Sequence, residues 1–295
     1  MAQKHVRQPG RKVFNTLAIS FLTVMTILSI LPFVIIITGS FSSSDAIIRN
    51  GYSIFVQEFS LDAYKMIFVY PEEILSSARV SITITLLGTF AGLAIMAMAG
   101  YALSCREMKY RNKISFFFYF TTLFSGGLVP WYMLISGMGM RDTLAALIVP
   151  MLCSSFYILL IRNSMRQVPE SLAESAKIDG AGHMRIFLQI MIPLSTPILA
   201  TVALFLALSY WNNWYLASLF ITKTTMWPLQ FRLHRTLTAA EAVAQGGAEH
   251  FKNAIIPTET VKLATAVVAT GPIFLVYPFL QKYFVQGITV GAVKG

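Results

Sequence analysis

The sequence predicts an all-α integral membrane protein with six transmembrane helices. Of its 295 residues, 56% are hydrophobic and only 12% are charged, a balance far more apolar than that of a soluble domain. Six stretches are long and apolar enough to cross a bilayer, since a spanning helix needs about 20 mostly apolar residues. They cover about residues 14–38, 80–103, 114–136, 143–161, 190–221 and 263–281.

None of the six spans contains Asp, Glu, Lys, Arg or His. This argues against a proton relay or a voltage sensor, because both depend on ionisable groups within the membrane. The first apolar run is too long for the hydrophobic region of a signal peptide, and no small-residue cleavage site ends it. We therefore expect the first span to remain in the protein.

Lysine and arginine residues near the spans predict the side of the membrane on which each segment lies. The N-terminal tail carries four bases and no acid, and the loop after the second span carries four bases against Glu107. Both segments are expected in the cytoplasm, and six spans then place both termini there. The cytoplasmic segments hold fourteen bases and four acids, which accounts for the whole formal net charge of +10. The basic excess therefore follows the positive-inside rule and does not indicate nucleic-acid binding.

We expect a single domain over residues 1–295, with no internal repeat. A short amphipathic stretch is predicted at 61–68, and a helix is predicted near 238–245, before the Gly246-Gly247 break. The expected segments outside the spans are the outer loops 40–79 and 222–262, the cytoplasmic loop 162–189 and the cytoplasmic tail 282–295.

The motifs of nucleotide-binding and hydrolytic sites are absent from the sequence. It contains no G-x-x-x-x-G-K-[ST], H-E-x-x-H or G-x-S-x-G pattern, and its four histidines are not spaced as metal ligands. Its two cysteines are too few and too scattered for a disulfide framework or a metal site. We therefore predict a protein that is not an enzyme and has no cofactor or metal of its own.

A charged segment between the fourth and fifth spans predicts a short helix, a tight turn and a second helix. Pro169 suits a first helical position, and Glu170 complements the positive end of the helix dipole. Gly180 follows Asp179 and ends the helix, because glycine readily adopts the left-handed conformation. Taken alone, such a helix either lies on the bilayer surface or docks onto a protein. Its narrow apolar face is formed by Leu172, Ala173 and Ala176.

This segment resembles the EAA loop of binding-protein-dependent ABC importer permeases, whose pattern is E-A-A, three residues and G. Glu174, Ser175, Ala176 and Gly180 follow the pattern, with serine replacing the usual second alanine. The resemblance implies the type I ABC importer permease fold and a coupling helix that sits in a groove of an ATPase subunit. The residues expected at that contact are Glu170, Leu172, Ala173, Glu174, Ser175, Ala176, Asp179, Gly180 and Ala181.

The resemblance also implies a set of partners in a bacterial inner membrane. These are a second homologous permease subunit, two ATPase subunits that hold ATP and Mg²⁺, and an extracytoplasmic substrate-binding protein. Membrane lipid surrounds the multi-pass chain, and no nucleic acid is involved. The cargo would cross by alternating access.

The fifth span contains an unusual density of amide and aromatic side chains. Amides facing lipid are costly, so this patch is expected to face the bundle or a water-filled path, where aromatic faces and amides suit a sugar. The alternatives are an aromatic belt at the membrane interface and polar contacts between helices. The residues of this predicted substrate path are Tyr210, Trp211, Asn212, Asn213 and Trp214.

The C-terminal end and the third span add to the resemblance. The last ten residues are similar to the terminus of the smaller maltose permease subunit, which implies contact with the ATPases, although such a tail could also fray. The segment Phe124–Pro130 resembles permeases for complex oligosaccharides such as alginate. The tail residues expected to contact the ATPases are Gln286, Gly287, Thr289, Gly291 and Lys294.

These observations predict an importer subunit for oligosaccharides, with acidic ones such as alginate oligomers as a further hypothesis. Basic residues of the outer loop would suit a uronate, although such residues are usually only solvated. They are Arg232, Arg235, Lys252 and Lys262. The competing hypothesis is an ATP-independent secondary transporter or channel for small polar solutes, because six spans alone do not identify an importer.

Overall fold

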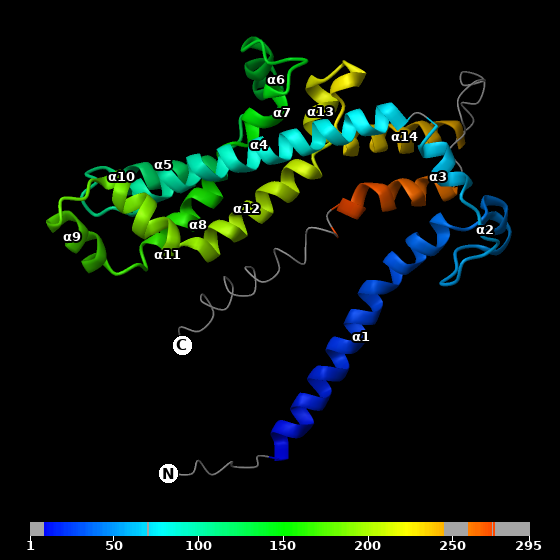
Figure 1. Ribbon diagram of the computed structural model, residues 1–295, viewed down its shortest axis with the longest axis horizontal. Helices are drawn as coiled ribbons and strands as arrows, with labels where there is room; N and C mark the ends of the chain where they lie inside the picture. Colours follow the sequence, from blue (N-terminus) through cyan, green and yellow to red (C-terminus); the bar gives the residue numbers. More distant parts are fainter. Residues whose placement is uncertain (1–8, 70, 245–258, 273, 275–295) are drawn as a thin grey trace. The chain divides into compact units, whose positions relative to one another are not determined.

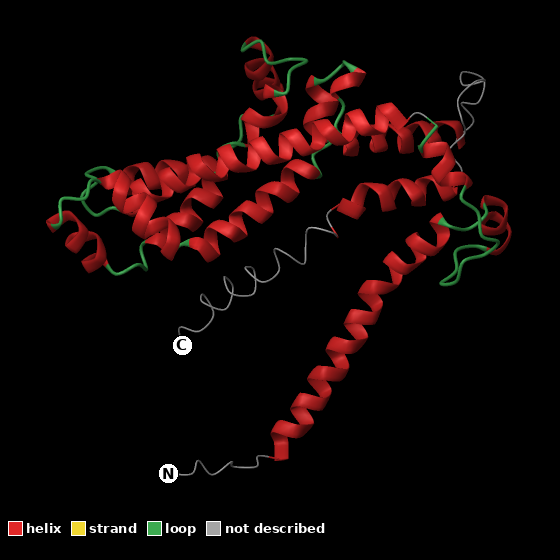
Figure 2. Cartoon of the chain, viewed as in Figure 1, coloured by secondary structure: helices red, strands yellow, loops and turns green. Residues whose placement is uncertain are grey.

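The computed structural model describes residues 9–69, 71–244, 259–272 and 274, and in these residues the secondary structure is helical (Figure 1, Figure 2). The described part contains one isolated β-bridge, Ser42 to Phe59, and no strand. The chain forms two compact units, and the single domain expected from the sequence remains a prediction. The first unit comprises Met1–Tyr70 and Thr236–Ala269, and the second comprises Pro71–Arg235 and Thr270–Gly295.

The first unit is built on the long apolar helix α1 (Pro9–Ser40). Its segment Val13–Ser40 has a mean hydropathy of 2.5, and the side chains from Val13 to Phe33 are almost all exposed within the first unit, as suits a helix that faces lipid. Hydroxyl groups along α1 donate to carbonyls one turn earlier, for example Thr23 to Ile19 at 2.8 Å, so they need no water. The first span is therefore close to the predicted one.

The first unit also contains two short helices, most of a further helical stretch and the end of α14 (Leu229–Ala244). Helix α2 covers Ser44–Asn50, and α3 covers Asp62–Ile67, where the sequence predicted an amphipathic stretch. A further helical stretch covers residues 259–272, within which Val261 and Ala264 pack against Ala63 of α3. The predicted sixth span, 263–281, lies partly outside the described residues.

The second unit is organised around helix α4 (Pro71–Ser104), which begins well before the predicted start at residue 80. It packs against α8 (Ser155–Met165) and α12 (Thr196–Trp211), with glycines at the closest approaches. A Cβ atom at Gly88 would lie 2.3 Å from the Tyr210 ring, and one at Gly100 would lie 2.7 Å from Ile161. Small residues let helices pack closely in a membrane, and the Gly88-x-x-x-Gly92 spacing on α4 is a signal that the sequence analysis missed.

The predicted third span is a pair of helices. Helix α5 (Arg111–Leu123) and helix α6 (Leu128–Gly137) meet at an angle of 115°. Gly127, at the break, has a φ of 85°, a left-handed value that favours glycine. Ser125-Gly126-Gly127 and the following Pro130 indicate a kink or an unwound point in this span, and the bend agrees with that expectation. Hydropathy alone does not reveal it, because the composition stays apolar through it.

The predicted fourth and fifth spans are also interrupted. In the fourth, α7 (Ala145–Ile148) continues into the turn η1 (Val149–Met151). This first half meets α8 at an angle of 46°. In the fifth, α10 (His183–Ile186), the π-helical turn η2 (Phe187–Met191) and α11 (Ile192–Leu194) meet α12 at 82°. Prolines on both sides of Ser195 explain this break, since each removes a helical hydrogen bond.

The predicted fifth span also ends early, because α12 stops at Trp211. After a gap the chain forms α13 (Tyr215–Phe220), the turn η3 (Thr224–Met226) and α14 (Leu229–Ala244). By length and composition, two described helices can cross a membrane, or five if each bent pair forms one span. Six spans and the cytoplasmic termini therefore remain predictions.

Candidate functional site

The charged segment singled out in the sequence forms helix α9 (Glu170–Ile178), at the end of the second unit opposite α13 (Figure 1). Gly180 has a φ of 80°, as predicted. The amide of Gly180 donates to the carbonyl of Lys177 at 2.9 Å, and that of Ala181 donates to Ala176 at 2.8 Å. This pair of bonds is the Schellman motif, which satisfies the last carbonyls of the helix and turns the chain sharply toward α10.

The predicted apolar face of α9 is divided between the core and the solvent. Ala173, Ala176 and Ala181 are half-buried and pack against the hydrophobic core formed by α4, α8 and α12. Leu172 points elsewhere and is 43% exposed, because it lies about 100° around the helix from Ala173.

The outer side of this segment exposes apolar and polar groups together. Ile178 is 87% exposed and Met184 is 62% exposed, which is costly for side chains in contact with water. The remaining predicted contact residues are also exposed. They are Glu170, Glu174, Ser175, Asp179 and Gly180.

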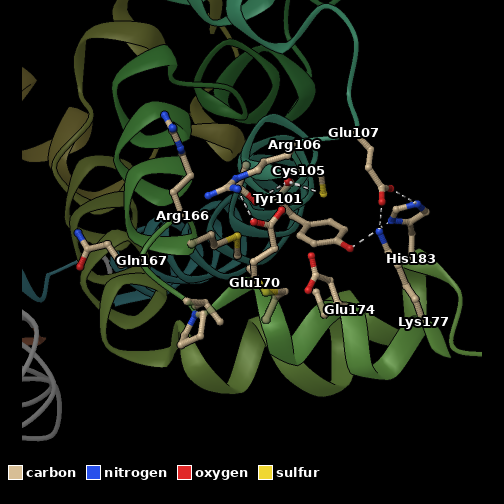
Figure 3. A pocket seen from close by; sticks show the side chains of 16 residues that line it. Tyr101, Cys105, Arg106, Glu107, Arg166, Gln167, Glu170, Glu174, Lys177 and His183 are labelled. Carbon is tan, nitrogen blue, oxygen red and sulfur yellow. Dashed lines mark hydrogen bonds and ion pairs between the residues drawn. The ribbon is translucent and has the colours of Figure 1, made fainter. Parts of the chain in front are cut away.

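The loop between α4 and α5 faces the inner side of α9 with charged residues (Figure 3). Arg106 forms an ion pair with Glu170 at 2.7 Å, and Glu107 accepts a hydrogen bond from Lys177. The Nε2 atom of His183 lies 3.7 Å from the Glu107 carboxylate. The hydrogen bond and charge of Lys177 lower the pKa of Glu107, and the more distant His183 acts in the same direction.

A cavity of about 370 Å³ separates α9 from this loop and from the end of α8. Tyr101 stands between the two walls, with its ring 5.2 Å from that of Phe187 and its hydroxyl 3.4 Å from Nδ1 of His183. The Cys105 thiol lies beside it, and burial raises the pKa of that thiol. The cavity lining is strongly polar, as its charged members show: Arg106, Glu107, Arg166, Glu170, Glu174, Lys177 and His183.

The predicted substrate path coincides with the gap between α12 and α13. Tyr210 instead belongs to the core, since it is fully buried and donates a hydrogen bond to the carbonyl of Ile148 at 2.9 Å. Trp211 is also buried. The aromatic side chains that end α12 therefore pack within the unit, because α12 crosses α4 at glycines that leave room for them.

The amide residues of this patch lie in the non-helical gap. Asn213 accepts a hydrogen bond from the amide of Leu216 at 2.9 Å and thereby starts α13, while Asn212 is exposed. Trp214 is 38% exposed and stacks on His234 with ring centroids 3.9 Å apart. Asn212 and Trp214 are thus the members of the predicted patch with open surfaces.

The opposite end of the unit is held by two polar contacts that the sequence did not reveal. Asp142, with a left-handed φ of 56°, accepts hydrogen bonds from the amides of Thr222 at 2.5 Å and Lys223 at 3.2 Å. Hydrogen bonds from the Thr222 side chain and these amides lower the pKa of Asp142. This aspartate joins the α6–α7 loop to the end of α13.

Arg232 forms the second of these contacts. Its guanidinium donates to Ser77 at 2.6 Å, pairs with Glu73 and lies 5.5 Å from the ring centre of Trp227. The side chain is therefore engaged within the unit, and its suggested contact with a uronate remains a prediction. Lys262, another such residue, pairs with Glu259 at 2.7 Å.

The tail residues Gln286, Gly287, Thr289, Gly291 and Lys294 lie outside the described residues, as does Lys252. Among the side chains that the structure describes, no group of three or more His, Cys, Asp or Glu residues is placed to hold a metal ion.

Comparison with known proteins adds an independent line of information. The family described as "Binding-protein-dependent transport system inner membrane component" matches residues 10–290. The LplC protein of Bacillus subtilis (strain 168) is 41% identical over 291 residues, which are 99% of this chain and 98% of that protein. The polygalacturonan/rhamnogalacturonan transport system permease protein YtcP of the same strain is 36% identical over 284 residues, 96% of this chain and 99% of that one.

A solved structure shows the same architecture. It is the crystal structure of a bacterial ABC transporter involved in the import of the acidic polysaccharide alginate. One of its chains is 27% identical to this one, with a TM-score of 0.81 over 96% of this chain and 100% of that chain. The resemblance identified in the sequence is thereby confirmed.

Proposed function

This chain belongs to the family of binding-protein-dependent transport system inner membrane components, and from that membership we propose that it is a permease subunit of an ATP-driven importer for acidic oligosaccharides. It is an integral membrane permease of the ABC type. The proposal concerns its cargo, its partners and how they are coupled.

The acidic cargo is supported by two relatives taken together. One is named for the transport of polygalacturonan and rhamnogalacturonan, and the other belongs to a transporter of the acidic polysaccharide alginate. Polygalacturonan and alginate are both chains of uronic acids, so a carboxylate on each sugar is the chemistry that they share. Because Arg232 and Lys262 are engaged within the chain, the carboxylates are expected to meet other groups.

The observation that carries the coupling proposal is the exposed outer side of α9 and α10. Ile178 and Met184 expose their apolar side chains to solvent, and the polar Ser175 and Asp179 of the same segment are exposed as well. The Schellman turn at Gly180 fixes the backbone between Ile178 and Met184. Such a surface suits a groove on a soluble subunit better than it suits water. We infer that an ATPase subunit covers it, and that the bacterial complex contains two ATPases, a second permease and an extracytoplasmic binding protein.

The proposed mechanism is alternating access. Closure of the ATPases on ATP displaces α9, and the chain carries this movement through α10, η2 and α11 into α12. The 82° bend at Ser195 and the π-helical turn Phe187–Met191 lie on this route, so movement of α9 can change the angle between these helices.

The cargo is tested by ATP hydrolysis of the complex in lipid, with binding protein and a panel of neutral and uronate oligosaccharides. Stimulation by uronate oligomers supports the proposal, and stimulation by neutral sugars alone contradicts the acidic cargo. Uptake driven by an ion gradient in ATP-depleted vesicles would instead identify a secondary transporter.

The coupling surface is tested by Gly180→Trp. Nothing lies within 4 Å of a Cβ at this position, so the added ring meets no core atom, but the φ of 80° disfavours tryptophan and the ring covers the docking side of the turn. We expect the variant to insert and fold while ATP-driven uptake is lost. Uptake at the wild-type rate would show that α9 is not the coupling helix.

A further inference from the structure

Two adjacent residues of the α4–α5 loop reach opposite ends of α9. Arg106 pairs with Glu170 in the first turn of the helix, and Glu107 pairs with Lys177 in its last turn (Figure 3). These two partners are seven positions apart on the helix, which corresponds to about 10 Å along its axis. The loop therefore contacts α9 at two separated points. These two contacts oppose both translation and rotation of α9.

The helix dipole does not explain this arrangement. An arginine beside the positive N-terminal end and a glutamate beside the negative C-terminal end are both opposed by the dipole. The pairs with Glu170 and Lys177 must therefore determine where Arg106 and Glu107 lie. His183, at 3.7 Å from Glu107, places a third group at the same end.

Close packing contributes less here than elsewhere in the unit. The cavity of about 370 Å³ lies between α9 and the loop, and only small side chains, such as Ala173 and Ala176, reach the core from α9. A helix that rests on alanines beside a cavity has few dispersion contacts to fix its position. The two ion pairs across the cavity are therefore important for its placement.

The loop leads directly into the centre of the unit. It follows the last turn of α4, and that turn is tied to α8 by a hydrogen bond from Arg162 to the carbonyl of Leu103 at 3.3 Å. Helix α4 is also the element against which α8 and α12 pack. A displacement of α9 that reaches the loop is thus passed to α4 without travelling along the chain.

We propose that Arg106 and Glu107 are positioning residues that bind α9 to the α4–α5 loop, so that α9 and the adjacent end of α4 move as one body. This gives the coupling helix a second, non-covalent route to the membrane helices, beside the covalent route through α12. Only the movement of α9 in response to ATP rests on the proposed function.

The first experiment measures hydrogen exchange of residues 168–181 in the full chain in lipid nanodiscs. Each exposed ion pair shifts a local equilibrium by up to about fivefold, so Arg106→Gln with Glu107→Gln should raise exchange of α9 by about two- to tenfold. The matched control, Arg49→Gln with Glu58→Gln, removes an exposed pair of 3.2 Å in the other unit and should leave α9 unchanged.

A charge exchange separates the specific pair from a general loss of structure. Lys177→Glu alone places two carboxylates together, and adding Glu107→Lys restores a pair of opposite charges. Both variants carry the same unfavourable glutamate in the last turn of α9, so they differ in the residue at position 107 alone. Exchange in the double variant should return toward that of the wild type. Wild-type exchange in the Gln variants, or no rescue by the double variant, would overturn the proposal.

The second experiment measures the distance between spin labels at Ser171→Cys in α9 and Ala102→Cys in the last turn of α4, in the assembled complex with the two native cysteines replaced by serine. The distance should not change when a non-hydrolysable ATP analogue is added, but it should broaden or shift in the Arg106→Gln, Glu107→Gln variant. If the nucleotide shifted this distance equally in the wild type and in the Arg106→Gln, Glu107→Gln variant, α9 and the end of α4 would not move as one body. If no ATPase assembles with the chain, the proposed function fails, and the exchange experiment still decides whether the loop holds α9.

Discussion

Replacing Gly88 with alanine tests the packing at the centre of the second unit. The added Cβ would lie 2.3 Å from Cζ of Tyr210 and 2.6 Å from each Cε atom, far inside contact distance. The ring cannot swing away freely, because Tyr210 is fully buried and its hydroxyl donates to the carbonyl of Ile148. Either α4 and α12 must move apart, or the Tyr210 ring must move and break its hydrogen bond to Ile148.

The magnitude follows from three opposing contributions. Overpacking of this kind costs about 1–3 kcal/mol, and a hydrogen bond within a membrane contributes about 0.6 kcal/mol on average. In the opposite direction, replacing glycine with alanine within a helix stabilises that helix by up to about 1 kcal/mol. We therefore expect Gly88→Ala to lower the free energy of unfolding by about 1–3 kcal/mol.

The assay is unfolding of the purified chain in mixed micelles by increasing SDS, followed by circular dichroism. Gly137→Ala is the matched control, since nothing lies within 4 Å of a Cβ at that helical glycine, and its stability should be unchanged or slightly higher. Adding Tyr210→Leu to Gly88→Ala should recover part of the loss, because the smaller side chain frees the space. Equal stability of Gly88→Ala and the wild type, or strictly additive effects in the double variant, would refute the packing argument.

Two further predictions concern the polar contacts. Asp142→Ala should increase amide exchange at Thr222 several-fold, because the carboxylate that accepts its amide is lost and alanine tolerates the left-handed backbone poorly; Asp142→Asn, which keeps one acceptor and tolerates that backbone, should lose less. Unchanged exchange in Asp142→Ala would contradict this role. The lowered pKa of Glu107 means that its contribution is fully present above the ordinary value of 4.5 and is lost as the pH falls through the lowered pKa. Protection of α9, corrected for intrinsic exchange, should therefore be constant at neutral pH and fall below about pH 4.5, whereas in Glu107→Gln the decrease should be smaller.

The sequence was sufficient for the class of the protein and for its family. Apolar composition and the distribution of basic residues are properties of the chain itself, because a bilayer selects for them without regard to the tertiary contacts. The left-handed turn at Gly180 was equally predictable, since it depends on the backbone freedom of one residue. The loop pattern around Glu174, supported by the match over residues 10–290, gave the family in the same way.

The interruptions of the spans were only partly visible. Gly126-Gly127 and the prolines beside Ser195 mark positions where a helix can break, yet the chain stays apolar through both. Hydropathy averages over about 20 residues, so it predicts straight spans where the structure has bends of 115° and 82°. The angle at each break is set by what the two helical halves pack against.

The partners of individual side chains were decided by the tertiary structure alone. Arg106 and Glu107 counted in the sequence only as charges of a loop, and the partners of Tyr210 and Arg232 within the chain were not predicted. Each of these side chains meets a partner from a distant part of the chain, such as Glu170 for Arg106. The sequence by itself determined which segments suit lipid and which suit water, because that choice depends on local composition. Only the packing of α4, α8, α9 and α12 determined which polar groups face one another, because contacts between distant segments exist only once the helices are in place.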